Sequence, residues 1–319
     1  MADTISTPLA GAAPAAGKTG TVRKASSLAL LSRRRSVIAV MLCLPLMTII
    51  FGLKLWPTLY GIYLSMLNRK MTEFVFLDNY IFLLGRNTFQ MIIFQTCLFA
   101  ITAVILKAIL GFIIAHLMHN IRGRNERIWR GLLLVPWVIP LSLSTLSWWW
   151  LLDPSYSAFN WTLQWMGFHK IAFLGDTWNA RFVVILVNVW FGAPFFMIMY
   201  LAALKSVPDQ LYEAASIDGA NAFQKLIHIT LPMMRNVISI TVLYSLIITF
   251  ADFDIVRILT NGGPQDATHL FATYAFTIGI QSGNLPRGAA VSLFMLPILA
   301  TFAFLILRGV NKRNKEISA

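Results

Sequence analysis

The sequence has few charged residues, and acidic residues are especially scarce. Charged side chains make up 12% of the 319 residues, and only 13 residues are Asp or Glu. A soluble domain carries about 25% charged residues. Because 57% of this chain is hydrophobic, its composition excludes an ordinary soluble domain and indicates a protein embedded in a membrane.

Cysteine is scarce as well, since only Cys43 and Cys97 occur and both lie in apolar runs. This excludes a disulfide framework, and no cysteine spacing is typical of a metal site. His116 and His119 share a predicted helix face, but they lack a third ligand or an intervening glutamate. No nucleophile–base motif of the G-x-S-x-G type occurs. We therefore expect no active site for covalent chemistry, no metal and no cofactor in this chain.

The N-terminal segment also lacks a true phosphate-binding loop. Its "GAAPAAGKTG" places five residues between Gly11 and Gly17, whereas the G-x-x-x-x-G-K-[ST] loop needs four so that backbone amides wrap the phosphates. Any ATP-driven work is therefore expected to use a separate polypeptide.

Long hydrophobic runs, in contrast, are abundant. A helix needs about 20 apolar residues to cross a hydrocarbon core about 30 Å thick, and six runs meet that length. The sequence therefore predicts an all-α, polytopic membrane protein with six transmembrane helices. The predicted spans are Ser36–Trp56, Phe89–Leu117, Gly131–Leu152, Ala180–Leu204, Val237–Ile258 and Gly288–Leu307.

The net charge of +13 is distributed unevenly between the loops. With the N-terminus inside, the inner segments carry 17 Lys and Arg and the outer segments carry 7. This asymmetry follows the positive-inside rule and predicts that both termini are cytoplasmic. We divide the chain into a flexible cytoplasmic tail (1–35), the first span with its outer loop (36–88), a five-helix core (89–308) and a C-terminal cytoplasmic tail (309–319).

One inner loop, 205–236, is polar and holds "YEAASIDGANAFQKLIHITLP" at 212–232. Pro208 and Asp209 are typical of a helix start. The pair Asp218-Gly219 favours a turn. A second helix, Phe223–Ile229, is expected to end at Leu231-Pro232. The loop therefore predicts a helix–turn–helix lying across the inner membrane face.

This loop resembles the EAA signature of binding-protein-dependent ABC importers, E-A-A-x3-G-x9-I-x-L-P, and matches it without a gap. The wider chain is similar to carbohydrate-uptake permeases of the maltose and glycerol-phosphate types, which share the MetI-like permease fold. Further matching segments are "LWPTLYGIYLSM", "LDNY", "RGRNERIWRGLLLVPWVIP" and "ILTNGGP".

The resemblance implies that the loop is the coupling helix, held in a groove of a cytoplasmic ATPase that binds ATP and Mg²⁺. It also implies a second permease subunit, two copies of the ATPase, an extracytoplasmic solute-binding protein, and a place in the bacterial cytoplasmic (inner) membrane. The residues expected to couple to the ATPase are Glu213, Ala214, Ala215, Asp218, Gly219, Ile229, Leu231 and Pro232.

A polar solute also needs polar or aromatic partners inside the membrane, because each uncompensated polar group costs about 2–7 kcal/mol. Ser245, Thr249 and Asp252 are spaced to share one face of the fifth span, and an acid within a span indicates function. The resemblance places the solute pathway on the fourth and fifth spans, at Phe191, Gly192, Phe195, Ser245, Ile248, Thr249 and Asp252.

Alternative interpretations stay open at this point. An ion-coupled secondary transporter would use Asp252, Asp254 and Lys107, and a membrane-embedded enzyme or a scaffold is a third reading. The side chain of Lys107 either faces the helix bundle or extends to the inner surface. "TNGGP" at 260–264 is either a plain surface turn or a turn beneath the docked binding protein. The solute is not identified, and the partner subunit is an alternative place for its main site.

Overall fold

The computed structural model describes residues 35–121, 123–155 and 157–318, and all regular elements in this part of the chain are helical. Two compact units are distinguished, one ending at Pro57 and one beginning at Thr58. The first unit holds α2 (Arg35–Ile49) and the π-helical turn η1 (Ile50–Leu55). Of the predicted N-terminal tail, 1–35, only Arg35 lies within the described residues.

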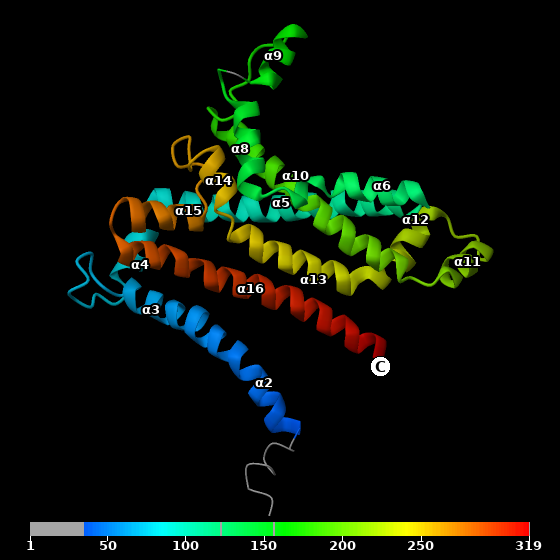
Figure 1. Cartoon of the computed structure of the whole chain (residues 1–319), viewed down its shortest axis with the longest axis horizontal. Helices are drawn as coiled ribbons and strands as arrows, with labels where there is room; N and C mark the ends of the chain where they lie inside the picture. Colours follow the sequence, from blue (N-terminus) through cyan, green and yellow to red (C-terminus); the bar gives the residue numbers. More distant parts are fainter. Residues whose placement is uncertain (1–34, 122, 156, 319) are drawn as a thin grey trace, which may run out of the picture. The chain divides into compact units, whose positions relative to one another are not determined.

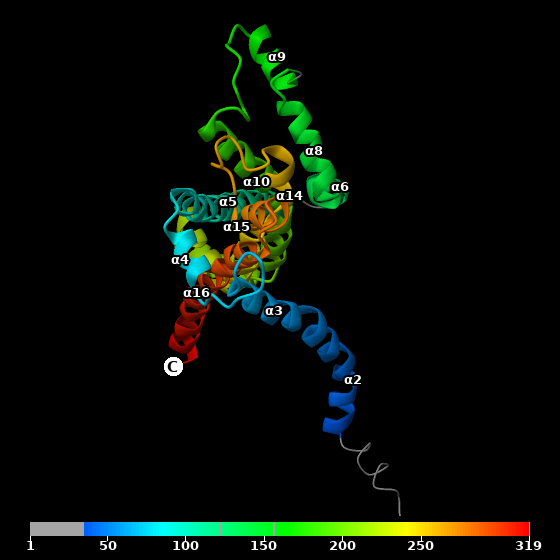
Figure 2. The ribbon, with the colours of Figure 1, turned by 90° about the vertical axis from the view of Figure 1, so that its left-hand side faces the viewer.

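The second unit is built around two long helices, α5 and α10, which pack along each other (Figures 1 and 2). Helix α16 packs on α13, α15 and α4. The elements from the unit boundary onward are α3 (Trp56–Ser65), α4 (Asp78–Leu84), α5 (Asn87–His119), α6 (Arg124–Leu133), α7 (Val135–Val138), α8 (Leu141–Leu152), α9 (Ala158–Trp165), α10 (Thr177–Lys205), α11 (Asp209–Ile217), α12 (Ala222–Lys225), η2 (Leu226–Thr230), α13 (Leu231–Phe250), α14 (Asp254–Leu259), α15 (Phe271–Phe276), η3 (Thr277–Gln281) and α16 (Leu285–Ser318).

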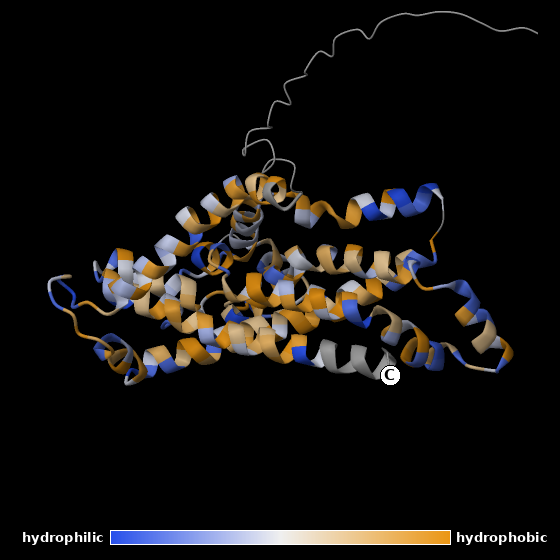
Figure 3. Cartoon of the chain, turned by 90° about the horizontal axis from the view of Figure 1, so that it is seen from below, coloured by the Kyte–Doolittle hydropathy of each residue, from blue (hydrophilic) through white to orange (hydrophobic). Residues whose placement is uncertain are grey.

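The predicted all-α membrane fold is confirmed. Within the described residues, five helical segments are long and apolar enough to cross a membrane. Hydrophobic residues dominate the long helices, while hydrophilic residues gather towards their ends (Figure 3). The five segments are Ile38–Ser65, Asn87–His119, Thr177–Lys205, Ala222–Phe250 and Leu285–Gly309.

The third predicted span, Gly131–Leu152, is not among these five segments, because this run is divided among α6, α7 and α8 and forms no single long helix. Ile139 adopts an extended conformation, with φ −70° and ψ 135°. The reason is Pro140, since proline disfavours the α conformation of the residue before it. The apolar length needed for a span is present, but the helix is interrupted in the middle.

The boundary between the two compact units, at Pro57, falls within the segment 36–88 that the sequence assigns to the first span and its outer loop, and that division of the chain stays a prediction. Helix α16 continues to Ser318, so the segment predicted as a tail from 309 is a helical extension of the last span.

Helices α5 and α10 approach closely because glycine lies at their contact. A β-carbon at Gly111 would collide with Phe196, and one at Gly192 would lie 2.5 Å from Cδ of Lys107. The two contacts occur in the same order along both helices, so α5 and α10 run parallel. Large buried side chains, among them Phe89 and Phe250, fill the core around this pair.

Candidate functional site

The polar loop forms a helical hairpin at one end of α10, and we refer to residues 209–232 as the hairpin. Its first arm, α11, begins directly after Pro208, as predicted. Gly219 turns the chain with a φ of +79°, a conformation that glycine adopts without strain. The second arm begins with a capping box, in which Asn221 and Gln224 each donate a backbone N–H to the other's side-chain oxygen at 2.8 Å.

The second arm does not end at Leu231-Pro232, so that part of the prediction is wrong. Helix α12 continues through the π-helical turn η2 into α13, and one apolar helical segment runs from Ala222 to Phe250. Proline lacks an N–H and is tolerated at the first positions of a helix, and the π-helical turn lies directly before it. The second arm is therefore mechanically continuous with the fifth span.

Two polar contacts join the arms of the hairpin. The hydroxyl groups of Tyr212 and Thr230 lie 2.9 Å apart, and Nζ of Lys225 donates to Oγ of Ser216 at 2.7 Å. Just before the hairpin, Nζ of Lys205 at the end of α10 pairs with Oε1 of Glu126 in the first turn of α6. The hydrogen bond from Lys205 lowers the pKa of the Glu126 carboxyl. The two arms are thus tied to each other, and the helix that leads into the hairpin is tied to α6.

The hairpin presents apolar side chains that are largely exposed in the part of the chain that the structure describes. Ile217 is 87% exposed and Phe223 is 68% exposed. The carboxylate of Glu213 is exposed, and no hydrogen bond or ion pair is found for it among the described residues. Of the other residues predicted to contact the ATPase, Ala215 and Ile229 are half-buried. The remaining residues of this group are exposed, namely Ala214, Asp218, Gly219, Leu231 and Pro232.

The second predicted group of residues surrounds one cavity of about 170 Å³ between α10 and α13. The structure brings all seven predicted pathway residues into its lining. They are Phe191, Gly192, Phe195, Ser245, Ile248, Thr249 and Asp252. Aromatic rings form part of the wall, since the Phe195 ring lies 5.9 Å from Trp137 and 5.3 Å from Tyr244 between centroids.

The position of Asp252 differs from the prediction of one helix face. Helix α13 ends at Phe250, and Asp252 lies between α13 and α14. Its Oδ1 accepts a hydrogen bond from the Ile255 backbone N–H at 3.2 Å, as short acidic side chains do at helix starts. Its Oδ2 accepts from Nδ2 of Asn188 at 3.0 Å. The carboxylate enters the cavity through a helix break rather than along a helix face.

Lys107 faces the helix bundle, which decides between the two orientations left open by the sequence. Its side chain is 4% exposed, and Nζ donates to Oγ1 of Thr249 at 2.8 Å. Gly192 accommodates the aliphatic stem of this lysine. A larger residue at position 192 would push the ammonium group away from the cavity.

Sequence reasoning missed several cavity residues, namely Trp137, Leu141, Asn188 and Tyr244. Asn188 was recognisable in principle, because an amide within an apolar run needs a hydrogen-bond partner. The aromatic and aliphatic residues carried no such signal, since they do not differ from other residues that face lipid or core.

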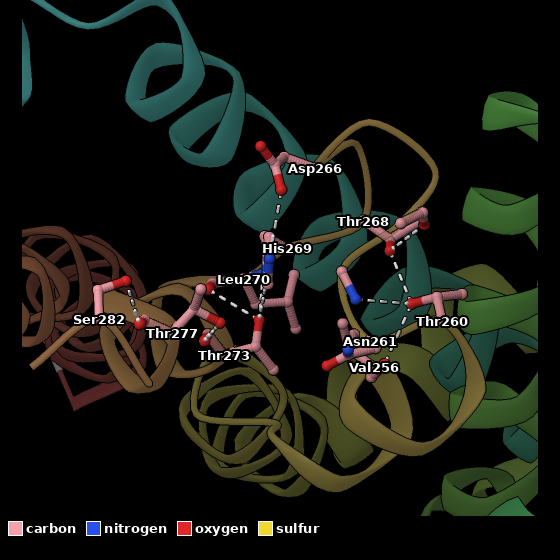
Figure 4. Close-up of polar contacts among 12 residues, drawn as sticks. Val256, Thr260, Asn261, Asp266, Thr268, His269, Leu270, Thr273, Thr277 and Ser282 are labelled. Atoms are coloured by element: carbon pink, nitrogen blue, oxygen red, sulfur yellow. Dashed lines mark hydrogen bonds and ion pairs between the residues drawn. The ribbon is translucent and has the colours of Figure 1, made fainter. Parts of the chain in front are cut away.

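The loop 260–273 forms a third structured region (Figure 4). The hydroxyl groups of Thr260 and Thr268 lie 2.7 Å apart, and Thr268 also donates to the Gly263 carbonyl. Gly262 has a φ of +90° and lies against the His269 ring, and Oγ1 of Thr273 lies 3.1 Å from Nδ1 of that histidine. The "TNGGP" segment is therefore part of a cross-braced loop rather than a simple surface turn.

Comparisons with known proteins agree with these features. Residues 107–315 match the family described as "Binding-protein-dependent transport system inner membrane component". The chain is 32% identical to the trehalose/maltose transport system permease protein MalF of Thermococcus litoralis, over 87% of this chain and 95% of that protein. It is 29% identical to the diacetylchitobiose uptake system permease protein DasB of Streptomyces coelicolor, over 89% of this chain and 90% of that protein.

Among solved structures, the fold is similar to a bacterial ABC transporter involved in the import of the acidic polysaccharide alginate. The TM-score is 0.75 at 20% sequence identity, over 88% of this chain and 96% of that chain. The family match covers more than half of the residues and includes both the hairpin and the cavity. This chain therefore belongs to the family of binding-protein-dependent transport system inner membrane components, the permease subunits of ABC importers.

Proposed function

We propose that this chain is a transmembrane subunit of an ATP-driven importer that translocates a sugar or sugar-like solute by alternating access. The observation that carries the proposal is the hairpin, which is braced internally and continuous with a membrane span. A helix that leaves the membrane and bears exposed Ile217 and Phe223 suits a partner that buries this surface. The partner we assign is a cytoplasmic ABC ATPase.

The continuity of η2 with α13 supports a mechanical role. A rigid-body displacement of the hairpin by the closing ATPase would be transmitted along α13 to the residues that line the cavity. The residues proposed to receive this force are Glu213, Ala214, Ala215, Asp218, Gly219, Ile229, Leu231 and Pro232. Glu213 supports this role as an exposed carboxylate available for a basic group of the ATPase.

The cavity supports a sugar-like solute. Aromatic faces such as Phe195 and Tyr244 suit the C–H faces of a sugar ring, and Ser245, Thr249 and Asp252 offer hydrogen bonds to hydroxyl groups. Relatives named for trehalose, maltose and diacetylchitobiose uptake are consistent with this class. The ion-coupled alternative is set aside because the family is binding-protein-dependent.

The complete importer would hold a second permease subunit, two ATPase copies and an extracytoplasmic binding protein. ATP and Mg²⁺ would be bound by the ATPase, and this chain would perform no catalysis and hold no cofactor. The 17-to-7 distribution of Lys and Arg supports cytoplasmic termini and a cytoplasmic hairpin in the bacterial inner membrane.

The test is co-purification of the ATPase with variants of the tagged chain. Phe223→Ser removes the exposed aromatic ring of the hairpin. Phe168→Ser is the control, because it removes an aromatic ring that is 60% exposed but lies outside the hairpin. We expect Phe223→Ser to lose most of the ATPase and all ATP-dependent sugar uptake, whereas Phe168→Ser retains the ATPase. Full ATPase retention by Phe223→Ser, with normal uptake, would overturn the proposed coupling.

A further inference from the structure

Two opposite charges line the central cavity, and they are its only charged lining residues in the described part of the chain. The ammonium group of Lys107 comes from α5, and the carboxylate of Asp252 comes from the break between α13 and α14. Their nearest recorded partners are neutral, namely Thr249 for Lys107 and Asn188 for Asp252. No ion pair of 4.0 Å or less is found between them.

Burying a single charge among apolar helices is unfavourable, and burying two opposite charges is much less so because they compensate each other. Lys107 is 4% exposed, so its charge is largely withdrawn from solvent. Thr249 connects the two groups in space, since its hydroxyl accepts from Lys107 and its backbone carbonyl accepts from the backbone N–H of Asp252 at 3.2 Å. The cavity as a whole is therefore close to electrically neutral.

The cavity also has unused hydrogen-bonding capacity of both kinds. An ammonium group has three donors, and one contact, to Thr249, is recorded for Lys107 among the described residues. Asn188 donates to Asp252, but no hydrogen-bond partner is found for its buried Oδ1 within the described part of the chain. Buried acceptors are nearly always hydrogen-bonded, so the orphan oxygen of Asn188 indicates a ligand or water that donates a hydrogen bond to it.

A spare cationic donor beside a spare neutral acceptor suits a hydroxyl group, which accepts one hydrogen bond and donates another. A carboxylate or phosphate group of a solute fits this pair poorly, because Asp252 would repel it and an ionised group has no hydrogen-bond donor for the Oδ1 of Asn188. We propose that Lys107 and Asn188 bind hydroxyl groups of an uncharged saccharide, and that the balance of Lys107 against Asp252 disfavours acidic saccharides. This inference rests on the proposed function and names its substrate class.

The experiment is a double-mutant cycle in proteoliposomes that hold the complete importer and its binding protein. The probe is an equimolar mixture of neutral malto- and chito-oligosaccharides with oligosaccharides of uronic acids, and accumulated sugars are identified by mass spectrometry. We expect the unaltered importer to accumulate neutral members. Accumulation of uronic oligosaccharides would overturn the inference while leaving an ATP-driven sugar importer, whereas no ATP-dependent sugar accumulation would contradict the proposed function itself.

The variants then separate charge balance from simple damage to the fold. Lys107→Met and Asp252→Asn each leave one uncompensated charge, and we expect each to reduce neutral-sugar uptake at least tenfold. The double variant restores neutrality and is expected to transport better than either single variant. A double variant that does not transport better than both single variants would overturn the proposed balance. Lys170→Met, in an exposed loop, is the matched control and is expected to leave uptake unchanged.

The proposed hydroxyl acceptor is tested separately. Asn188→Leu removes the orphan oxygen together with the donor to Asp252, whereas Asn188→Asp keeps an acceptor and adds a negative charge. We expect both variants to lose neutral-sugar uptake, and we expect Asn188→Asp combined with Asp252→Asn to recover part of it because a single carboxylate again opposes Lys107. No recovery in that combination, with the complex intact by size-exclusion chromatography, would contradict the role of the charge balance.

Discussion

The hydroxyl groups of Tyr212 and Thr230 lie 2.9 Å apart and join the first arm of the hairpin to η2. Thr230 is 4% exposed, and its hydroxyl also donates to the Lys225 carbonyl within the π-helical turn at 3.3 Å. Together with the contact from Lys225 to Ser216, this bond holds α11 against the segment that leads into α13. We therefore expect the stiffness of the hairpin to depend in part on this bond.

Replacing Tyr212 with Phe removes this bond and keeps the ring. A hydrogen bond of this kind contributes about 1 kcal/mol, so we expect normal insertion and assembly but a several-fold lower number of solutes transported per ATP hydrolysed. The measurement is parallel uptake and phosphate release in proteoliposomes. Tyr60→Phe, on an exposed ring of α3, serves as the control. An unchanged number of solutes transported per ATP hydrolysed in Tyr212→Phe would show that this hydrogen bond does not contribute to coupling.

The turn at Gly219 permits a comparison between two glycines with similar backbones. Gly219 and Gly167 have φ values of +79° and +86°, each follows a helix end with the same pattern of backbone hydrogen bonds, and a β-carbon would meet no neighbour within 4 Å at either position. Substitution by Ala costs about 1 kcal/mol at each, from the left-handed conformation alone. We expect Gly219→Ala to reduce transport coupling and Gly219→Asp to abolish it, as Glu213→Lys would do.

Gly167→Ala is the control for that pair, because it introduces the same kind of backbone strain at a helix end outside the hairpin. Uptake and ATPase activity are measured together with the amount of inserted protein. Equal loss of uptake in Gly167→Ala and Gly219→Ala would indicate a general stability effect. Full ATP-driven uptake in Gly219→Asp would count against the assignment of the hairpin as the coupling element.

Gly262 is expected to be intolerant of any side chain. It has a φ of +90°, and a β-carbon there would overlap the imidazole ring of His269. Gly262→Ala therefore adds a steric clash to the backbone strain, and we expect it to destabilise the loop by more than about 1 kcal/mol. Gly283→Ala has the strain without a clash, since Gly283 has a φ of +64° and no neighbour within 4 Å. Hydrogen exchange of residues 260–273 measures the difference, and equal protection in both variants would contradict it.

The same loop is expected to loosen in acid. Burial lowers the pKa of His269 below its ordinary value of about 6.5, although Asp266 at 3.6 Å opposes the shift and Arg257 reinforces it. The unfolded loop therefore binds a proton more readily than the folded loop, and stability falls as the pH drops below about 6.5. Above that pH the histidine is neutral in both states and the loop is fully stable.

Hydrogen exchange at pH 7.5 and pH 5.5, corrected for intrinsic rates, tests this expectation. We expect protection of 260–273 to fall at the lower pH in the native chain. His269→Gln keeps a polar side chain without titrating in this range, so the pH dependence should disappear in that variant. A pH dependence that persists in His269→Gln would place its origin in another group.

Much of the architecture followed from local features of the sequence. Hydrophobic length located the membrane-spanning helices, because a span needs about 20 apolar residues whatever surrounds it. Pro208 and Gly219 located the start and the turn of the hairpin, because proline and glycine act on their own backbone angles. The predicted pathway residues do line one cavity, while their role in transport stays a prediction.

The failures occurred at two prolines within apolar runs. The run around Pro140 is long enough for a span, but the helix breaks at Ile139 because proline disfavours the α conformation of the residue before it. The sequence predicts a helix end at Leu231-Pro232, whereas the chain continues through a π-helical turn directly before it. Apolar length alone therefore did not show which proline interrupts the helix and which is accommodated.

The sequence by itself determined which segments enter the membrane and where the polar hairpin lies, because burial of apolar length and backbone restriction act locally. Only the tertiary structure decided that Lys107 reaches Thr249, which lies 142 residues further along the chain, and that Asp252 enters the same cavity through a helix break. Such contacts depend on how α5, α10 and α13 pack, and that packing is fixed by the combined fit of many side chains, so no local pattern encodes it.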